Sequence, residues 1–103
     1  MRAVCLNCAR KHLAKAIARS MELPEYDGNV DDDHWWGMVA QLSEAEDHLR
    51  KEYPILADSI RDDRKAIEED HDTNPRASYA VLATMDFNKY IVEINEIAAT
   101  LAG

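Results

Sequence analysis

Apolar side chains recur at intervals of three and four residues along most of this 103-residue chain, the spacing of one face of an α-helix. The chain has only three glycines and three prolines. Turn-forming residues gather at residues 23–30, 51–54 and 72–75, which divides the chain into four segments. The pattern therefore predicts an all-α fold: a single small four-helix bundle-like domain over residues 1–103, beginning with a helical hairpin.

The first predicted helix covers about residues 4–21, and the second runs from an N-cap at residues 31–33 to about residue 51. A third begins at Pro54, and a fourth, without a breaker, runs from Arg76 to about Leu101 after an Asn74 cap. The expected buried stripes of the first two helices are Leu6, Ala9, Leu13, Ala16 and Ile17, and Trp35, Met38, Leu42, Ala45 and Leu49. Those of the last two are Ile55, Leu56, Ile60 and Ile67, and Tyr79, Leu82, Ala83, Phe87, Tyr90, Ile94, Ile97 and Leu101.

Both cysteines lie in the stretch Cys5-Leu6-Asn7-Cys8-Ala9-Arg10-Lys11-His12. A helix turns about 100° per residue, so Cys5, Cys8 and His12 are expected on one face. Thiolates and imidazoles are the ligands that structural zinc sites use. Small buried thiols in a helix seam, and a redox pair, are the alternatives for the two cysteines.

The fourth zinc ligand follows from pairing the first two helices antiparallel about a turn at residues 26–27. Facing residues then have numbers that sum to roughly 53, because both helices rise equally per residue. This register places Cys5 opposite His48, His12 opposite Gln41, and Arg19 opposite His34. The sequence predicts one structural zinc ion held by Cys5, Cys8, His12 and His48, with Glu44 as a substitute ligand or a hydrogen-bond acceptor behind the ligands.

The Cys-x-x-Cys-x-x-x-His spacing, followed by Ala16, resembles the redox motif of alkylhydroperoxidase D-like proteins, which are also all-helical. The resemblance implies that Cys5 and Cys8 cycle between dithiol and disulfide and that His12 relays protons. The glutamate of that family lies upstream of its motif, where this sequence has no room for it. Glu44 or Glu46 would have to take its place.

Two further resemblances concern short motifs. The opening residues 5–13 and the stretch Leu-Ser-Glu-Ala-Glu-Asp at 42–47 resemble small uncharacterised phage-type helical proteins, which implies no known activity. Glu68-Glu69-x-x-Asp72 with Glu93-x-x-Glu96 resembles the carboxylate pattern of all-α nucleotide pyrophosphatases similar to MazG. That likeness implies a Mg²⁺ site, because paired carboxylates can hold Mg²⁺ against a triphosphate.

Charge is distributed unevenly along the chain, whose net charge is −8. Residues 1–20 carry five bases and no acid, whereas residues 21–72 carry 17 acids against five bases, a local balance of −12. This balance opposes direct nucleic-acid binding, although an acidic body is compatible with nucleic-acid mimicry. No apolar run reaches the roughly 20 residues of a membrane span, and the opening residues lack an apolar signal core, so we expect a cytoplasmic protein.

These observations together predict a small non-catalytic interaction or regulatory protein with a structural zinc site. The predicted partner surface consists of Lys11, Lys15, Arg19 and Trp36, where charge and one aromatic side chain would meet a protein partner or a second copy of the chain. A thiol redox enzyme and a Mg²⁺-dependent nucleotide pyrophosphatase are the enzymatic alternatives.

Overall fold

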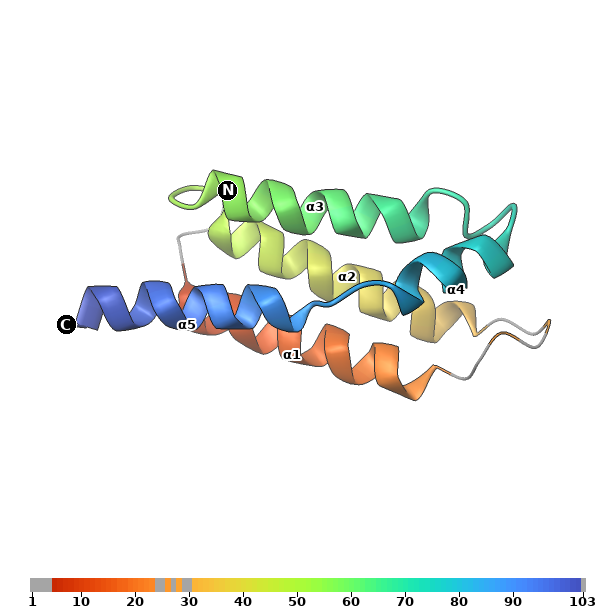
Figure 1. Cartoon of the computed structure of the whole chain (residues 1–103), viewed down its shortest axis with the longest axis horizontal. Helices are drawn as coiled ribbons and strands as arrows, with labels where there is room; N and C mark the ends of the chain where they lie inside the picture. The colour runs from red at the N-terminus through yellow and green to blue at the C-terminus, as the bar shows by residue number, and fades with distance from the viewer. Residues whose placement is uncertain (1–4, 24–25, 27, 29–30, 103) are drawn as a thin grey trace.

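The computed structural model describes residues 5–23, 26, 28 and 31–102, and these residues form helices and no strand (Figure 1). The helices are α1 (Leu6–Glu22), α2 (Asp32–Leu49), α3 (Pro54–Glu68), α4 (Pro75–Ala83) and α5 (Asn88–Ala102). The all-α prediction is therefore confirmed. None of the described helices is both long and apolar enough to cross a membrane.

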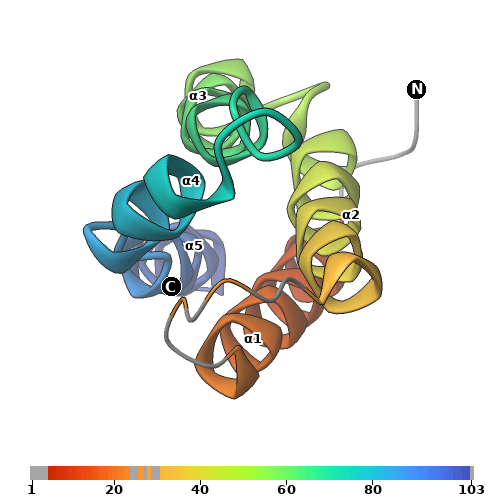
Figure 2. The same cartoon turned by 90° about the vertical axis from the view of Figure 1, so that its right-hand side faces the viewer.

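The helices surround one common interior, which Figure 2 shows end-on. α1 and α2 pair along their lengths, α3 packs beside α2, and the fourth side is made by α4 and α5 in tandem, with α4 against α3 and α5 against α1. The result is an elongated bundle of 49 × 23 × 20 Å. This arrangement is the predicted bundle-like fold with an N-terminal hairpin, whose predicted turn at residue 27 lies outside the described residues.

Local capping explains where the helices begin. The Asp31 carboxylate accepts the amide of His34 at 3.0 Å, and the Asn74 side chain accepts the amide of Ala77 at 3.3 Å. Each bond satisfies an amide that has no partner within its helix. Pro54 and Pro75 occupy first helical positions, where a missing amide hydrogen does no harm.

The prediction of one unbroken helix from residue 76 to residue 101 was wrong. The backbone leaves the helix at residues 84–87, where the Thr84 hydroxyl donates to the Val81 carbonyl at 2.7 Å and the Asp86 carboxylate accepts the Asn88 amide at 3.1 Å. Such short polar side chains offer the backbone partners outside a helix. The apolar spacing continues through the break, since Phe87 is only 4% exposed, and this continuity concealed the break in the sequence.

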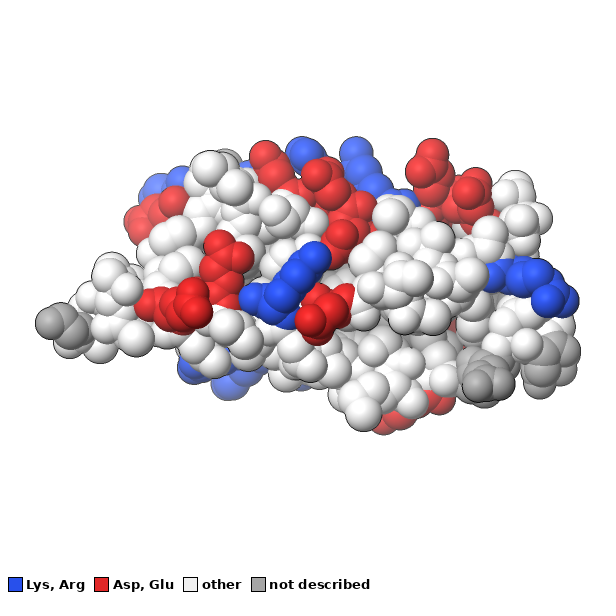
Figure 3. Space-filling model, viewed as in Figure 1, with Lys and Arg blue, Asp and Glu red and all other residues white. Residues whose placement is uncertain are grey.

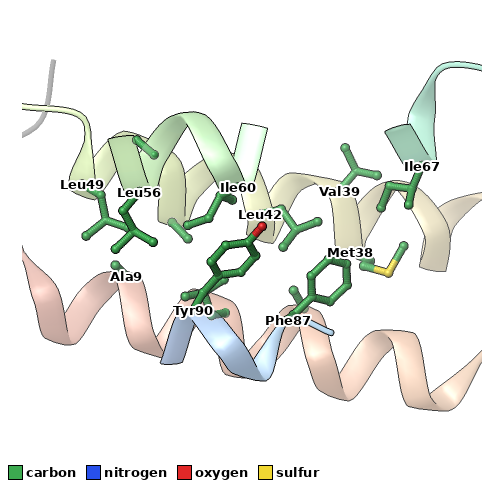
Figure 4. Packing of buried hydrophobic residues seen from close by; sticks show 14 of the residues in the cluster. Ala9, Met38, Val39, Leu42, Leu49, Leu56, Ile60, Ile67, Phe87 and Tyr90 are labelled. Carbon is green, nitrogen blue, oxygen red and sulfur yellow. The ribbon is translucent and has the colours of Figure 1, made fainter. Parts of the chain in front are cut away.

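The core is built from the predicted stripes. All five α2 positions from Trp35 to Leu49 are fully buried, as are Ala9, Leu13 and Ala16 of α1. Figure 4 shows Phe87 and Tyr90 reaching from the α5 side towards α2 and α3. Three positions were wrongly assigned to buried faces: Ile55 is 83% exposed, Leu101 is 70% exposed, and Ala83 is exposed as well.

Ion pairs join α2 to α3 beside this core. Glu46 is only 8% exposed and accepts hydrogen bonds from Arg50 at 2.8 Å and from Arg64 at 3.2 Å. Arg50 also pairs with Asp58 and, through that hydrogen bond, holds the pKa of the Asp58 carboxyl below its ordinary value. Figure 3 shows basic side chains interspersed among the acidic ones along α3. The Glu46 and Asp58 carboxylates are therefore neutralised locally by arginines.

Candidate thiol and histidine site

The α1–α2 hairpin has the register that equal helical rise predicts. The Cys5 amide donates to the His48 carbonyl at 3.3 Å, and His12 Nδ1 lies 2.6 Å from Gln41 Oε1. At the far end of the hairpin, His34 Nε2 lies 2.9 Å from the Arg19 carbonyl oxygen. In each contact the two residue numbers sum to 53, so the prediction of facing residues is confirmed at three heights.

Cys5 and Cys8 form a disulfide at the start of α1, with Cα atoms 5.2 Å apart. Cys5 is the N-cap of the helix, and its Sγ accepts the Cys8 amide at 3.1 Å. Both cysteines are half-buried. Paired sulfurs are not thiolates, so the predicted ligand set of Cys5, Cys8, His12 and His48 stays a prediction for the reduced chain.

Between α1 and α2, three side chains from the two helices converge. His12 of α1 and Glu44 and His48 of α2 are half-buried and bring one ligand-type atom each to within 4.8 Å of one another. The two imidazole rings stack, with centroids 5.6 Å apart and planes 14° apart. Of the two glutamates that the sequence offered, Glu44 therefore lies in the cluster, whereas Glu46 points to the arginines between α2 and α3.

Gln41 is the residue of this site whose role sequence reasoning missed. Its Oε1 faces His12 Nδ1, so a neutral imidazole here donates from Nδ1 and has its lone pair on Nε2. The register arithmetic had already put Gln41 opposite His12, and that was the signal for this contact. An amide is neither a usual zinc ligand nor a base, so the residue type alone gives no signal for this role.

The four residues of the predicted partner surface differ in their exposure and contacts. Lys11 and Lys15 are exposed on α1. Arg19 is half-buried and extends across Gly37 of α2, since a Cβ at that glycine would meet Arg19 Nη1 at 2.9 Å. Trp36 is 37% exposed, and its indole stands edge-on to His71 with ring centroids 5.5 Å apart. Arg19 and Trp36 thus both have packing roles within the bundle.

His71, in the turn between α3 and α4, forms a buried polar cluster that the sequence did not predict. Its ring is 2% exposed, stacks on Trp35 at 4.1 Å, and has Ser78 Oγ at 2.9 Å and Asp32 Oδ1 at 3.1 Å. The Ser78 hydroxyl donates to the Pro75 carbonyl within its own helix. This cluster fastens the turn before α4 to the start of α2, so we assign it to the fold.

The carboxylates that resemble a pyrophosphatase site do not gather. Glu68 pairs with Arg64 at 3.0 Å, and neither it nor Glu93 belongs to a group of three that could hold a metal. Within the described part of the chain, His12, Glu44 and His48 are the group that meets that criterion.

A hollow of about 570 Å³ lies at the opposite end of α1, between Met21, Tyr26, Arg76 and Phe87. It is remote from the cysteines along the helix.

Compared with protein-family models, curated proteins and solved structures, the chain has no match. The chemistry of the hairpin site is therefore what bears on the function of this protein.

Proposed function

We propose that the protein is a dithiol–disulfide oxidoreductase that exchanges two electrons with a disulfide substrate through Cys5 and Cys8. The observation that supports this function is the disulfide between two half-buried cysteines only three positions apart. A bond over so short a span does not link separate elements of the fold. In the predicted cytoplasmic location, disulfides are usually transient, and they serve catalysis or redox sensing.

Cys5 is the sulfur that we expect to attack the substrate. It caps α1, and the Cys8 amide points at its Sγ from 3.1 Å. An amide donor and the positive end of a helix both stabilise a thiolate over a thiol. Cys8 lies within the first turn, well placed to resolve a mixed disulfide on Cys5.

The exchange proceeds in two balanced steps. The Cys5 thiolate attacks one sulfur of the substrate, forming a mixed disulfide and releasing the other sulfur as a thiolate. The Cys8 thiolate then attacks Cys5 Sγ, closes the internal disulfide and releases the second substrate thiolate. The protein is oxidised by two electrons and the substrate disulfide is reduced to two thiols. The reverse sequence oxidises a dithiol substrate.

The neighbouring side chains support an acid–base role beside the thiols. His12 follows Cys8 by four positions on α1, and Glu44 lies in the same cluster as His12. The resemblance to alkylhydroperoxidase D-like proteins implies this pairing of an imidazole with a carboxylate. We therefore assign proton transfer to and from the Cys8 thiol to His12, with Gln41 orienting the imidazole through Nδ1 and the Glu44 carboxylate stabilising its protonated form.

Mixing reduced protein with excess aromatic disulfide, and counting the aromatic thiols released, tests this function. The wild-type chain should release two thiols and end with its internal disulfide. Cys8→Ser should release one and keep the other aromatic group on Cys5, as read from the intact mass. Cys5→Ser should react at least about tenfold more slowly, because its remaining thiol, Cys8, is not at the N-cap position that stabilises a thiolate.

The control is His34→Ala, which removes an imidazole from the far end of the same hairpin. It should release two aromatic thiols at the rate of the wild-type chain. Equal reactivity of the two single-cysteine variants, at the rate of the urea-unfolded chain, would contradict the proposal. So would release of a single thiol by the wild-type protein.

The second candidate function is the one predicted from the sequence, an interaction protein with a structural zinc ion. It requires the reduced chain, in which Cys5 and Cys8 are free to bind the ion. The stack of His12 on His48 at 5.6 Å favours it, because it brings together the two imidazoles of the predicted ligand set. Reduced protein that retains zinc through gel filtration and transfers no electrons to the disulfide would favour this candidate. A protein partner lost on Trp36→Ala would then support the predicted surface of Lys11, Lys15, Arg19 and Trp36.

A further inference from the structure

We propose that His12, Glu44 and His48 form a binding site for one divalent transition-metal cation that needs neither cysteine. The inference goes beyond the redox function and does not depend on it. It also differs from the four-ligand zinc site predicted from the sequence, because the ligand set contains no sulfur and includes Glu44 as a direct ligand.

Helix geometry brings the three ligands together. Glu44 and His48 are four positions apart on α2 and therefore share one face, and the hairpin register puts His12 of α1 against that face. Their ligand atoms lie within 4.8 Å of one another. Ligands of a tetrahedral zinc ion lie about 3.4 Å apart, as bond lengths of about 2.0–2.1 Å require. Side-chain rotations that move each ligand atom by less than about 1 Å would bring the three atoms to the distances of a zinc site.

Gln41 prepares His12 to act as a ligand. Its Oε1 accepts from His12 Nδ1 at 2.6 Å, so a neutral imidazole is oriented by Gln41 and keeps its Nε2 lone pair for a cation. A hydrogen bond from the non-ligating nitrogen to an oxygen acceptor accompanies nearly all metal-bound histidines. This contact is an independent indication that the cluster is built for a ligand.

The ligand chemistry indicates the kind of ion. Two imidazoles and one carboxylate suit Zn²⁺ and other first-row divalent cations, whereas Mg²⁺ and Ca²⁺ prefer oxygen ligands alone. Three protein ligands leave a tetrahedral ion one position for water or a substrate. The site is thus of the open type, in contrast to the closed four-ligand clip expected from the sequence.

The experiment is calorimetric titration of Zn²⁺ into the Cys5→Ser/Cys8→Ser double variant, which cannot perform thiol exchange. We expect one ion per chain. In this background, Glu44→Gln and His48→Gln should each weaken binding at least tenfold, and Gln41→Ala should weaken it by about tenfold. The matched controls Asp47→Asn, on exposed α2 surface, and His34→Gln, at the far end of the hairpin, should bind as the double variant does.

Co²⁺ supplies a second readout. Its complex with the double variant should show tetrahedral d–d bands, and its complex with the reduced wild-type protein should lack sulfur-to-cobalt charge transfer. Circular dichroism checks that each variant is folded, and Glu44→Gln is nearly isosteric, so it keeps the test interpretable if a histidine variant unfolds.

Failure of the double variant to bind Zn²⁺, or binding that Glu44→Gln and His48→Gln leave unchanged, would overturn the inference. Metal binding by the reduced wild-type protein alone, with charge-transfer bands, would replace it with the sulfur-containing ligand set. Failure of thiol exchange would not affect it, because the titration uses a chain without thiols.

Discussion

Tyr90 joins α5 to α3 through its hydroxyl group. The side chain is 2% exposed, and the hydroxyl donates to the Asp63 carboxylate and lies 3.0 Å from the Ser59 carbonyl oxygen. Burial, followed by the bond to Asp63, raises the pKa of Tyr90 well above its ordinary value of 10.0. Both effects disfavour the charged phenolate, so the folded protein keeps this proton where an unfolded chain would lose it.

Tyr90→Phe should therefore destabilise the fold in a pH-dependent way. Near neutral pH we expect a loss of about 1–3 kcal/mol in the free energy of unfolding, since the ring still packs while a buried hydrogen bond to a charged group is lost. Above about pH 10 only the unfolded wild-type chain ionises at this position, so the wild-type advantage should shrink as the pH rises. Urea unfolding between pH 7 and 11 measures this, and a constant difference would contradict it.

At the scale of the helices, two glycines with opposite surroundings predict opposite effects of adding a methyl group. Gly37 is helical, and its neighbour is the far end of the flexible Arg19 side chain. Gly28 has open space around it but a φ of +99°, which side chains other than that of glycine rarely adopt.

We expect Gly37→Ala to raise the midpoint of thermal unfolding and Gly28→Ala to lower it. The first gains about 0.5–1 kcal/mol of helix propensity once Arg19 moves aside. The second strains the backbone by about 1–2 kcal/mol. Scanning calorimetry of both variants against the wild type measures the pair. A lower midpoint for Gly37→Ala than for Gly28→Ala would show that free space, and not backbone conformation, decides the outcome.

The sequence predicted the features that depend on neighbouring residues in the chain and missed those that depend on the rest of the structure. Helix starts were predictable because Asp31, Asn74 and the prolines act locally. The facing residues of the hairpin were predictable because helical rise is uniform. The break at residues 84–87 was not, because the apolar spacing of Phe87 and Tyr90 continues the stripe of α4 through the short polar residues that end it. The convergence of His12, Glu44 and His48 was predicted only in part, since side-chain direction decided between Glu44 and Glu46.

For the whole molecule, the position of the disulfide bears on stability. It joins residues only three positions apart, so the loop that it removes from the unfolded state is very short. Loop entropy then contributes at most about 2 kcal/mol, against about 4.7 kcal/mol for a loop of about 100 residues. The described ion pairs and the buried stripes are independent of it.

The reduced protein should consequently stay folded. We expect reduction to lower the free energy of unfolding by no more than about 2 kcal/mol and to leave the helical circular-dichroism signal unchanged. Urea unfolding with and without reductant measures this, with the Cys5→Ser/Cys8→Ser variant as the control in which reductant has no effect. Loss of helix on reduction would assign the bond a structural role and weaken the redox proposal.

The packing of α5 on α1 has a consequence for the order of folding. Arg10 of α1 donates to the Asn95 side chain of α5 at 2.7 Å, across a sequence separation of 85 residues. The α1–α2 and α2–α3 contacts join neighbours in the chain, so they can form during synthesis, before α5 leaves the ribosome. One side of α1 stays uncovered throughout that interval. The helix that carries the cysteines is thus made before the other described helices and is enclosed only when α5 packs against it.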